Sequence, residues 1–139
     1  MVRLKTRYIL FQIRHGGEEE SGFVTNAKSI ISTIRLSMMK NFGDIGVADT
    51  LTTFAVKYFS TRTMVGILRV HFEAIERVLA AMFFVQAIDG KEIIMETIGV
   101  SGSISKCERR AIERNRKIIR KYRNKGLEIE EEPVIIIDE

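Results

Sequence analysis

A near-continuous apolar run close to the N-terminus, Tyr8-Ile9-Leu10-Phe11-Gln12-Ile13, constrains the fold more than any other feature of this chain. A strand with one face in water alternates apolar and polar residues, whereas a strand covered on both faces is apolar throughout. We therefore expect residues 3–13 to form a strand that lies inside a sheet, with both faces covered. The chain has 139 residues, 45% of them hydrophobic, which suffices for one domain with such a core.

The rest of the pattern predicts three further strands, over residues 51–59, 65–71 and 92–100. A first helix is expected to begin at Thr25 or Asn26 and to end at Gly43, with 43–46 forming a tight turn toward the next strand. A second helix is expected over 73–88 and a third over 105–125, the third opened by a capping box of Ser105 and Glu108.

This order predicts an α+β fold of the ferredoxin-like, or split βαβ, type. Four antiparallel strands would carry two helices on one face. The added C-terminal helix has a narrow apolar stripe of Ile104, Cys107, Ala111, Ile118 and Tyr122, which we expect to cover the other face. The chain is expected to divide into a domain of residues 1–125 and an acidic tail of residues 126–139.

The charge of the chain is segregated along its length. Residues 106–125 contain ten Lys or Arg and two Glu, and residues 126–139 contain six acids and no base. So dense a basic segment favours a polyanionic partner, because binding to phosphates releases condensed counterions. A solvated surface helix remains the alternative from charge alone.

Nucleic-acid contact would use cations from the third helix, from the alternating N-terminal basic residues and from two strand positions. The third strand, 64–70, has no aromatic residue, so we do not expect bases to stack on the sheet. The candidate RNA-binding residues are Arg3, Lys5, Arg7, Lys57, Arg69, Lys106, Arg109, Arg110, Arg116, Lys117, Arg120 and Lys121.

The residues with catalytic or metal-binding potential are sparse. His15 and His71 are the only histidines and Cys107 the only cysteine, so no Cys/His metal cluster is expected. Cys107 with His71 would be a conceivable nucleophile and base, but nothing in the local sequence supports this pair. No apolar run approaches the roughly 20 residues of a membrane helix. We expect no catalytic centre, no cofactor and no membrane partner.

Four stretches carry a family resemblance together and in order. They are Met1–Phe11; Asn41–Gly46; Val56–Ser60 with Thr63 and Gly66–Arg69; and Val100–Ile104 with Cys107. The chain resembles the small subunit shared by eukaryotic ribonucleases P and MRP, the Pop-five/Rpp-fourteen type family. Two positions depart from it, because Phe72 and Ser105 stand where the family is commonly basic. Both departures weaken the expectation of RNA contact there.

The resemblance implies an accessory subunit of an RNA-based endonuclease that matures the 5′ end of precursor transfer RNA, and in MRP serves ribosomal RNA processing. Catalysis would belong to the RNA and its Mg²⁺ ions. The implied partners are the RNase P or MRP RNA, a TIM-barrel-like protein subunit, other subunits and, indirectly, precursor transfer RNA. The implied location is the nucleus or nucleolus if the chain is eukaryotic, and the cytoplasm if archaeal. Whether it serves P, MRP or both stays open.

Two other classes of function also stay open. The first is a protein-interaction module of ferredoxin-like fold without direct RNA contact, in which the apolar tail segment 133–137 adds to a sheet edge of its own or of a partner. Alternatively the acidic tail folds back on the basic helix and screens it. The second class, a small-molecule or enzymatic domain, would need convergent polar groups that the sequence does not show.

Overall fold

The computed structural model describes residues 5–15, 25–126 and 133–137. The elements are β1 (Thr6–His15), α1 (Ala27–Asp49), β2 (Ala55–Phe59), β3 (Val65–His71), the 3₁₀ turn η1 (Phe72–Ala74), α2 (Ile75–Phe84), β4 (Ala87–Ile88), β5 (Lys91–Ser101) and α3 (Ile104–Asn124). The strands form an antiparallel sheet in the order β2-β3-β1-β5-β4. The α+β class is confirmed, and the order of the four longer strands agrees with the split βαβ arrangement.

The predicted count of four strands is wrong, because β4 adds a fifth. The second helix was expected to reach residue 88, but α2 ends at Phe84 and Val85 is already extended. Ala87 and Ile88 then pair with Glu92 and Lys91. Asp89 and Gly90 between them both have positive φ, at 51° and 79°, which is the backbone of a two-residue hairpin turn. The Asp-Gly turn therefore forms a hairpin instead of ending the helix.

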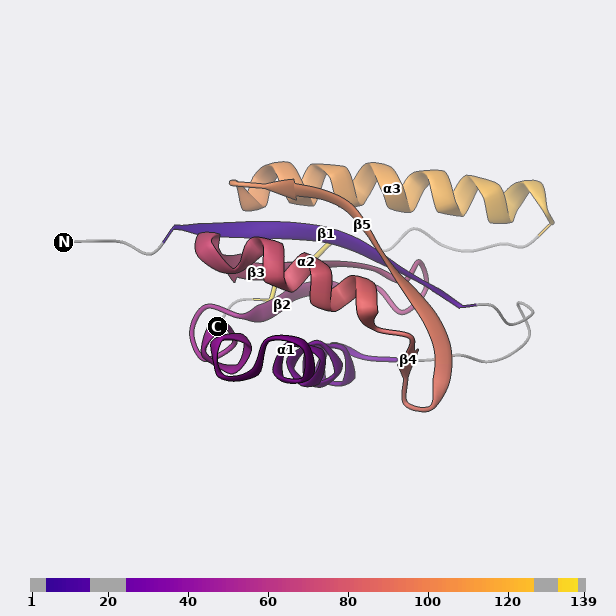
Figure 1. The fold of residues 1–139 in the computed structure, drawn as a ribbon. Coiled ribbons are helices and arrows are strands. Elements are labelled where there is room, and N and C mark those ends of the chain that lie inside the picture. Colours follow the sequence, from indigo (N-terminus) through magenta and orange to yellow (C-terminus); the bar gives the residue numbers. More distant parts are fainter. Residues whose placement is uncertain (1–4, 16–24, 127–132, 138–139) are drawn as a thin grey trace.

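The sheet is covered on both faces, as the apolar run in β1 predicts. Figure 1 shows α1 and α2 on one side of β1 and α3 on the other. Ile9, Phe11 and Ile13 enter the core beneath α1 and α2, whereas Leu10 belongs to a second core beneath α3. All four side chains are at most 2% exposed. None of the described helices is long and apolar enough to cross a membrane.

Gly43 does not end the first helix, contrary to the prediction, but kinks it. Its φ of 60° and ψ of −135° interrupt the helical backbone, which then resumes up to Asp49. Gly46 packs against the backbone of Met38 so closely that an added Cβ would clash with the Met38 carbonyl oxygen. Gly43 alone is therefore the bend between two helical pieces, and residues 44–46 are helical rather than part of a helix-to-strand turn. Both Gly43 and Gly46 disfavour a side chain.

The end of α1 is tied to the sheet and to α2 by a buried carboxylate. Asp49 is 6% exposed and accepts hydrogen bonds from Arg77 Nε at 2.5 Å and Arg77 Nη2 at 3.1 Å, and His71 Nε2 lies 3.3 Å from Asp49 Oδ1. The hydrogen bonds from Arg77 hold the pKa of Asp49 below its ordinary value, although burial acts to raise it. The charges of Arg77 and His71 also lower this pKa. These contacts hold the end of α1 against α2 and the end of β3.

We expect Asp49→Asn to lower stability at neutral pH and to lose this effect in acid. Because the folded-state pKa of Asp49 is depressed, its contribution is present above the unfolded-state value of about 3.9 and fades as pH falls through the folded-state pKa. Urea unfolding of wild type and variant from neutral to acid pH measures this difference. The exposed Asp44→Asn, on the same helix, is the control and should show no such convergence. A stability difference for Asp49→Asn that stays constant in acid would contradict the expectation.

Candidate nucleic-acid interface

The basic helix α3 lies across the sheet on a narrow buried stripe. Its buried residues are Cys107, Ala111, Asn115 and Ile119, at four-residue spacing. Ile118 and Tyr122, which the sequence placed in the stripe, are half-buried at its side. The predicted capping box is wrong: the helix begins at Ile104, with Ser103 rather than Ser105 as N-cap and without a side-chain capping bond. The helix is therefore held by its packing on the sheet rather than by its cap.

A polar network inside the stripe fixes the rotation of α3. Thr63 Oγ1 donates to Asn115 Oδ1 at 2.8 Å, and Asn115 Nδ2 donates to the Tyr58 hydroxyl at 2.9 Å. Arg114 Nε and Nη2 donate to Gln12 Oε1 at 3.0 and 2.9 Å, which supplies the partner for the polar residue within the apolar run of β1. Directional bonds to two strands and the β2–β3 connection leave α3 one orientation on the sheet.

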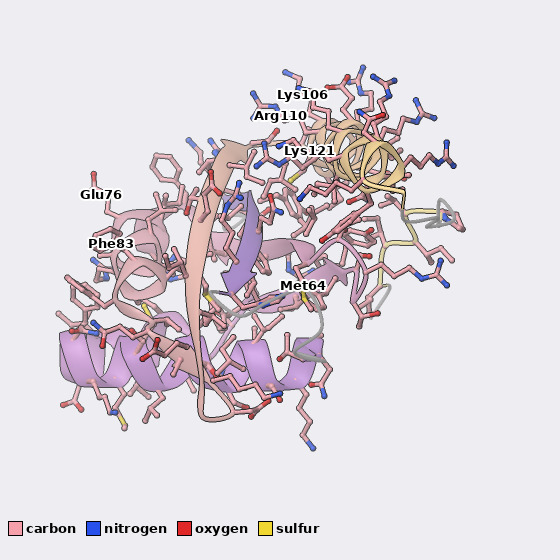
Figure 2. All side chains as sticks on the ribbon, turned by 90° about the vertical axis from the view of Figure 1, so that its right-hand side faces the viewer. Met64, Glu76, Phe83, Lys106, Arg110 and Lys121 are labelled. Atoms are coloured by element: carbon pink, nitrogen blue, oxygen red, sulfur yellow. The ribbon has the colours of Figure 1, made fainter. Side chains whose placement is uncertain are left out.

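This orientation turns the remaining cations outward. Figure 2 shows the nitrogen-tipped side chains around α3, with Lys106, Arg110 and Lys121 among them, away from Glu76 and Phe83 on α2. The exposed predicted residues of this helix are Lys106, Arg109, Arg110, Arg116, Lys117, Arg120 and Lys121. The structure therefore brings seven of the predicted residues together on one face, which we call the α3 basic face.

A groove runs beside the first turns of α3. It has a volume of about 530 Å³, and its lining residues are Val100, Ser101, Gly102, Lys106, Arg109, Arg110 and Glu113. Three of these residues are cationic and one is anionic. The groove thus combines the end of β5, the following turn and the α3 basic face into one positively charged hollow that suits an anion.

The N-terminal cations separate. Arg3 lies outside the described residues, and Lys5 is exposed just before β1. Arg7 is half-buried: its guanidinium lies over the Phe72 ring, with Cζ 4.9 Å from the ring centroid, and its Nη1 donates to the Thr6 carbonyl at 2.8 Å. Sequence reasoning missed this pairing, since no local pattern relates the start of β1 to the residue after β3.

Lys57 and Arg69 lie away from the α3 basic face, on β2 and β3. Lys57 is 7% exposed and is the extra residue of a bulge, since the register shifts between Val56 and Tyr58. Arg69 Nε donates to the Thr53 carbonyl at 2.8 Å. Their RNA contacts stay predictions, and the burial of Lys57 leaves its side chain little surface for a ligand.

The tail segment 133–137 lies against its own sheet. Val134 and Ile136 pack on the core beneath α3, and the Ile137 N–H donates to the Lys57 carbonyl at 2.7 Å. Of the three predicted placements, this favours addition at the chain's own sheet edge. Residues 127–132, which carry most of the acidic charge, lie outside the described residues. The domain boundary at 125 stays a prediction.

The groups with catalytic potential do not converge in the described part of the chain. Cys107 is fully buried on the face of α3 that packs against the sheet, where burial raises the pKa of its thiol to about 11. His71 pairs with Asp49 at the junction with α1 and α2. Cys107 therefore stays protonated at neutral pH and has no base in His71. Within the described ranges, no group of three or more His, Cys, Asp or Glu is arranged to hold a metal ion.

The sequence profile of the Rpp14/Pop5 family matches residues 7–112, a range that runs from β1 to the middle of α3. The chain belongs to the Rpp14/Pop5 family. The resemblance carried by the four sequence stretches is thereby confirmed. The matched range includes the strands, both core helices and most of the groove, and it ends before the last turns of α3.

Individual relatives agree with the family assignment. The chain is 36% identical over 127 residues to the ribonuclease P/MRP protein subunit POP5 of Schizosaccharomyces pombe, covering 86% of this chain and 91% of that protein. It is 38% identical over 140 residues to POP5 of Saccharomyces cerevisiae, covering 86% and 80%. Ribonuclease P protein component 2 of Pyrococcus horikoshii is 30% identical over 109 residues, covering 78% and 84%.

The fold itself recurs in a solved particle. A chain in the cryo-EM structure of yeast ribonuclease MRP superimposes with a TM-score of 0.56, covering 74% of this chain and 78% of that one. The two chains are 9% identical, so this likeness concerns the fold alone. The shared fold therefore assigns no role to individual residues of this chain.

Proposed function

We propose that this chain is a non-catalytic, RNA-binding protein subunit of a ribonuclease P or MRP particle. The observation that carries the RNA contact is the α3 basic face, whose orientation on the sheet is set by Asn115 and Arg114. Its relatives are named as protein subunits of ribonuclease P or MRP, which supports the assignment to such a particle.

The mechanism is electrostatic and architectural. Exposed cations along some five turns of helix neutralise backbone phosphates where RNA strands crowd together, and each contact releases condensed counterions. Such contacts position RNA without reading its sequence. In this role the protein stabilises the folded RNA, while cleavage at the 5′ end of precursor transfer RNA, or processing of ribosomal RNA, is carried out by the RNA with Mg²⁺.

A protein partner is part of the proposal. Phe84 at the end of α2 is 53% exposed, and Ile94 on β5 is 67% exposed. Apolar side chains with this exposure suit a docking contact with another protein subunit, which the proposal takes to be the TIM-barrel-like one. A protein-interaction module without direct RNA contact is the second candidate, and the exposure of Phe84 and Ile94 is the observation that favours it.

Gentle purification of the tagged full-length chain from its own cells, followed by sequencing of the bound RNA, tests the proposal. Strong enrichment of a ribonuclease P or MRP RNA is expected, and which of the two appears decides the particle. A nuclear or nucleolar source fraction is expected in a eukaryote, and a cytoplasmic one in an archaeon. Recovery of a protein partner without structured RNA would overturn the RNA contact and leave the interaction module.

A further inference from the structure

The pairing of Arg7 with Phe72 creates an exposed aromatic surface that the charge pattern does not predict. Phe72 begins η1, directly after β3, and its side chain is 50% exposed. The Phe72 N–H donates to the Lys5 carbonyl at 2.7 Å, so the start of β1 and the start of η1 are joined by backbone. With the Arg7 guanidinium over its ring, Phe72 is held in place although half of it faces solvent.

Arg7 links this ring to the basic groove. An added Cβ on Gly102 would lie 3.7 Å from the Nε, Cζ and Nη1 atoms of Arg7, so the guanidinium lies close beside Gly102, which lines the groove. In Figure 1 the start of β1, the start of α2, the end of β5 and the first turn of α3 lie at the same end of the molecule. Arg7 therefore lies between the Phe72 ring and Gly102 of the groove.

A second guanidinium, that of Arg110, approaches the backbone of β5 at Gly99, next to the residues of β5 that line the groove. Nη1 of Arg110 lies where a Cβ on Gly99 would stand, and a side chain at this position would displace it. Arg110 shares the groove with Lys106 and Arg109. The two glycines thus leave room for two arginine side chains, one beside the aromatic ring and one beside the anion-attracting groove.

An exposed ring with a guanidinium over it, next to a cluster of cations, has the chemistry that recognises an unstacked nucleotide. Single-stranded RNA is bound by stacking its bases on aromatic rings or on arginine planes while cations hold the adjoining phosphates. Inside duplex RNA, both faces of each base are already stacked on neighbouring pairs and are not free for such a ring. A single exposed phenylalanine on a protein surface needs no functional explanation. Phe72 differs from such a residue, because an arginine lies over its ring next to a basic groove. Phe83 is exposed as well, but no cation lies over its ring among the contacts described.

We propose that one unpaired RNA base stacks on the exposed part of the Phe72 ring, which Arg7 holds in place, while its adjoining phosphate lies in the groove of Lys106, Arg109 and Arg110. The ligand class is an unpaired nucleotide in a loop or bulge, in addition to the phosphates bound along α3. This inference rests on the proposed RNA contact of the α3 basic face and names the kind of RNA that the groove end binds.

The test compares two RNA probes and three variants of the full-length chain. The probes are a short single-stranded oligoadenylate with a fluorescent adenine analogue at its centre, and a blunt A-form RNA duplex of equal length. The variants are Phe72→Ala, Phe72→Tyr and the control Phe83→Ala, which removes an even more exposed phenylalanine on α2. Circular dichroism and urea unfolding establish that each variant folds.

We expect Phe72→Ala to weaken binding of the single strand about tenfold, in the range that base–aromatic stacking contributes. The quenching of the fluorescent base on binding should be lost as well. Phe72→Tyr keeps a ring and should bind and quench like wild type. Duplex binding should be the same for all, and Phe83→Ala should match wild type on both probes.

Equal effects of Phe72→Ala and Phe83→Ala on the single strand, with quenching retained, would overturn the stacking proposal. That result is separable from failure of the proposed function, because alanine substitutions along α3 would still weaken the binding of both probes. If wild type binds neither probe, the RNA contact and the stacking site both fall. An equal reduction of single-strand and duplex binding in Phe72→Ala would also overturn it, since a stacking contact needs a free base.

Discussion

Replacing Lys117, Arg120 and Lys121 together by alanine is expected to flatten the salt dependence of RNA binding. If each side chain neutralises one phosphate, the slope of log affinity against log salt should fall by roughly 2 to 3, at about 0.7 to 0.9 for each phosphate that is no longer neutralised. All three are exposed on the α3 basic face. Arg116 is left in place because it also interacts within the chain. Alanine favours helix, so α3 itself should persist.

A matched variant on the opposite layer separates local contact from net charge. Lys28, Arg35 and Lys40 are exposed on α1, and their replacement by alanine removes the same two lysines and one arginine. Fluorescence anisotropy with a structured RNA across a salt series measures both slopes. The α1 variant should keep nearly the wild-type slope. Equal slopes for the two variants would mean that RNA is attracted by overall charge and that α3 has no special role.

The second large effect is expected at Asn115, the buried residue that sets the orientation of α3. Asn115→Ala leaves the Thr63 hydroxyl and the Tyr58 hydroxyl without their partner in a region where all three residues are 5–7% exposed. Two buried hydroxyls left unsatisfied should lower the free energy of unfolding by about 2 to 4 kcal/mol. Urea unfolding measures this decrease directly.

The control is Asn124→Ala at the exposed end of the same helix, which should change the free energy of unfolding by less than about 0.5 kcal/mol. Adding Tyr58→Phe and Thr63→Val to Asn115→Ala should recover part of the stability, because the apolar replacements carry no hydroxyl to satisfy. A decrease at Asn115 no larger than at Asn124 would refute the view that this network holds α3 in place.

Much of the fold follows from periodicity that is local in the sequence. The apolar run of β1 implies a strand covered on both faces. The ten cations of residues 106–125 share their helix with a narrow apolar stripe, so only one face of that helix can be buried. Errors arose where backbone conformation overrides pattern: the helix continues past Gly43 because the kink allows it, and Asp89-Gly90 forms a hairpin turn. Whether a residue adopts a positive φ in these places depends on the tertiary contacts of the segment that follows it.

The sequence by itself determined the α+β class, the family and the basic segment, because each is a property of neighbouring residues or of ordered motifs. Only the tertiary structure decided which cations share a surface. It placed Lys57 in a buried bulge and turned the α3 cations outward through Asn115. It also set Arg7 on Phe72, far from it in the chain, because β1 pairs with β3 in antiparallel register from Thr6 opposite His71. Strand pairing is a long-range choice made by the whole sheet, so no local spacing reveals it.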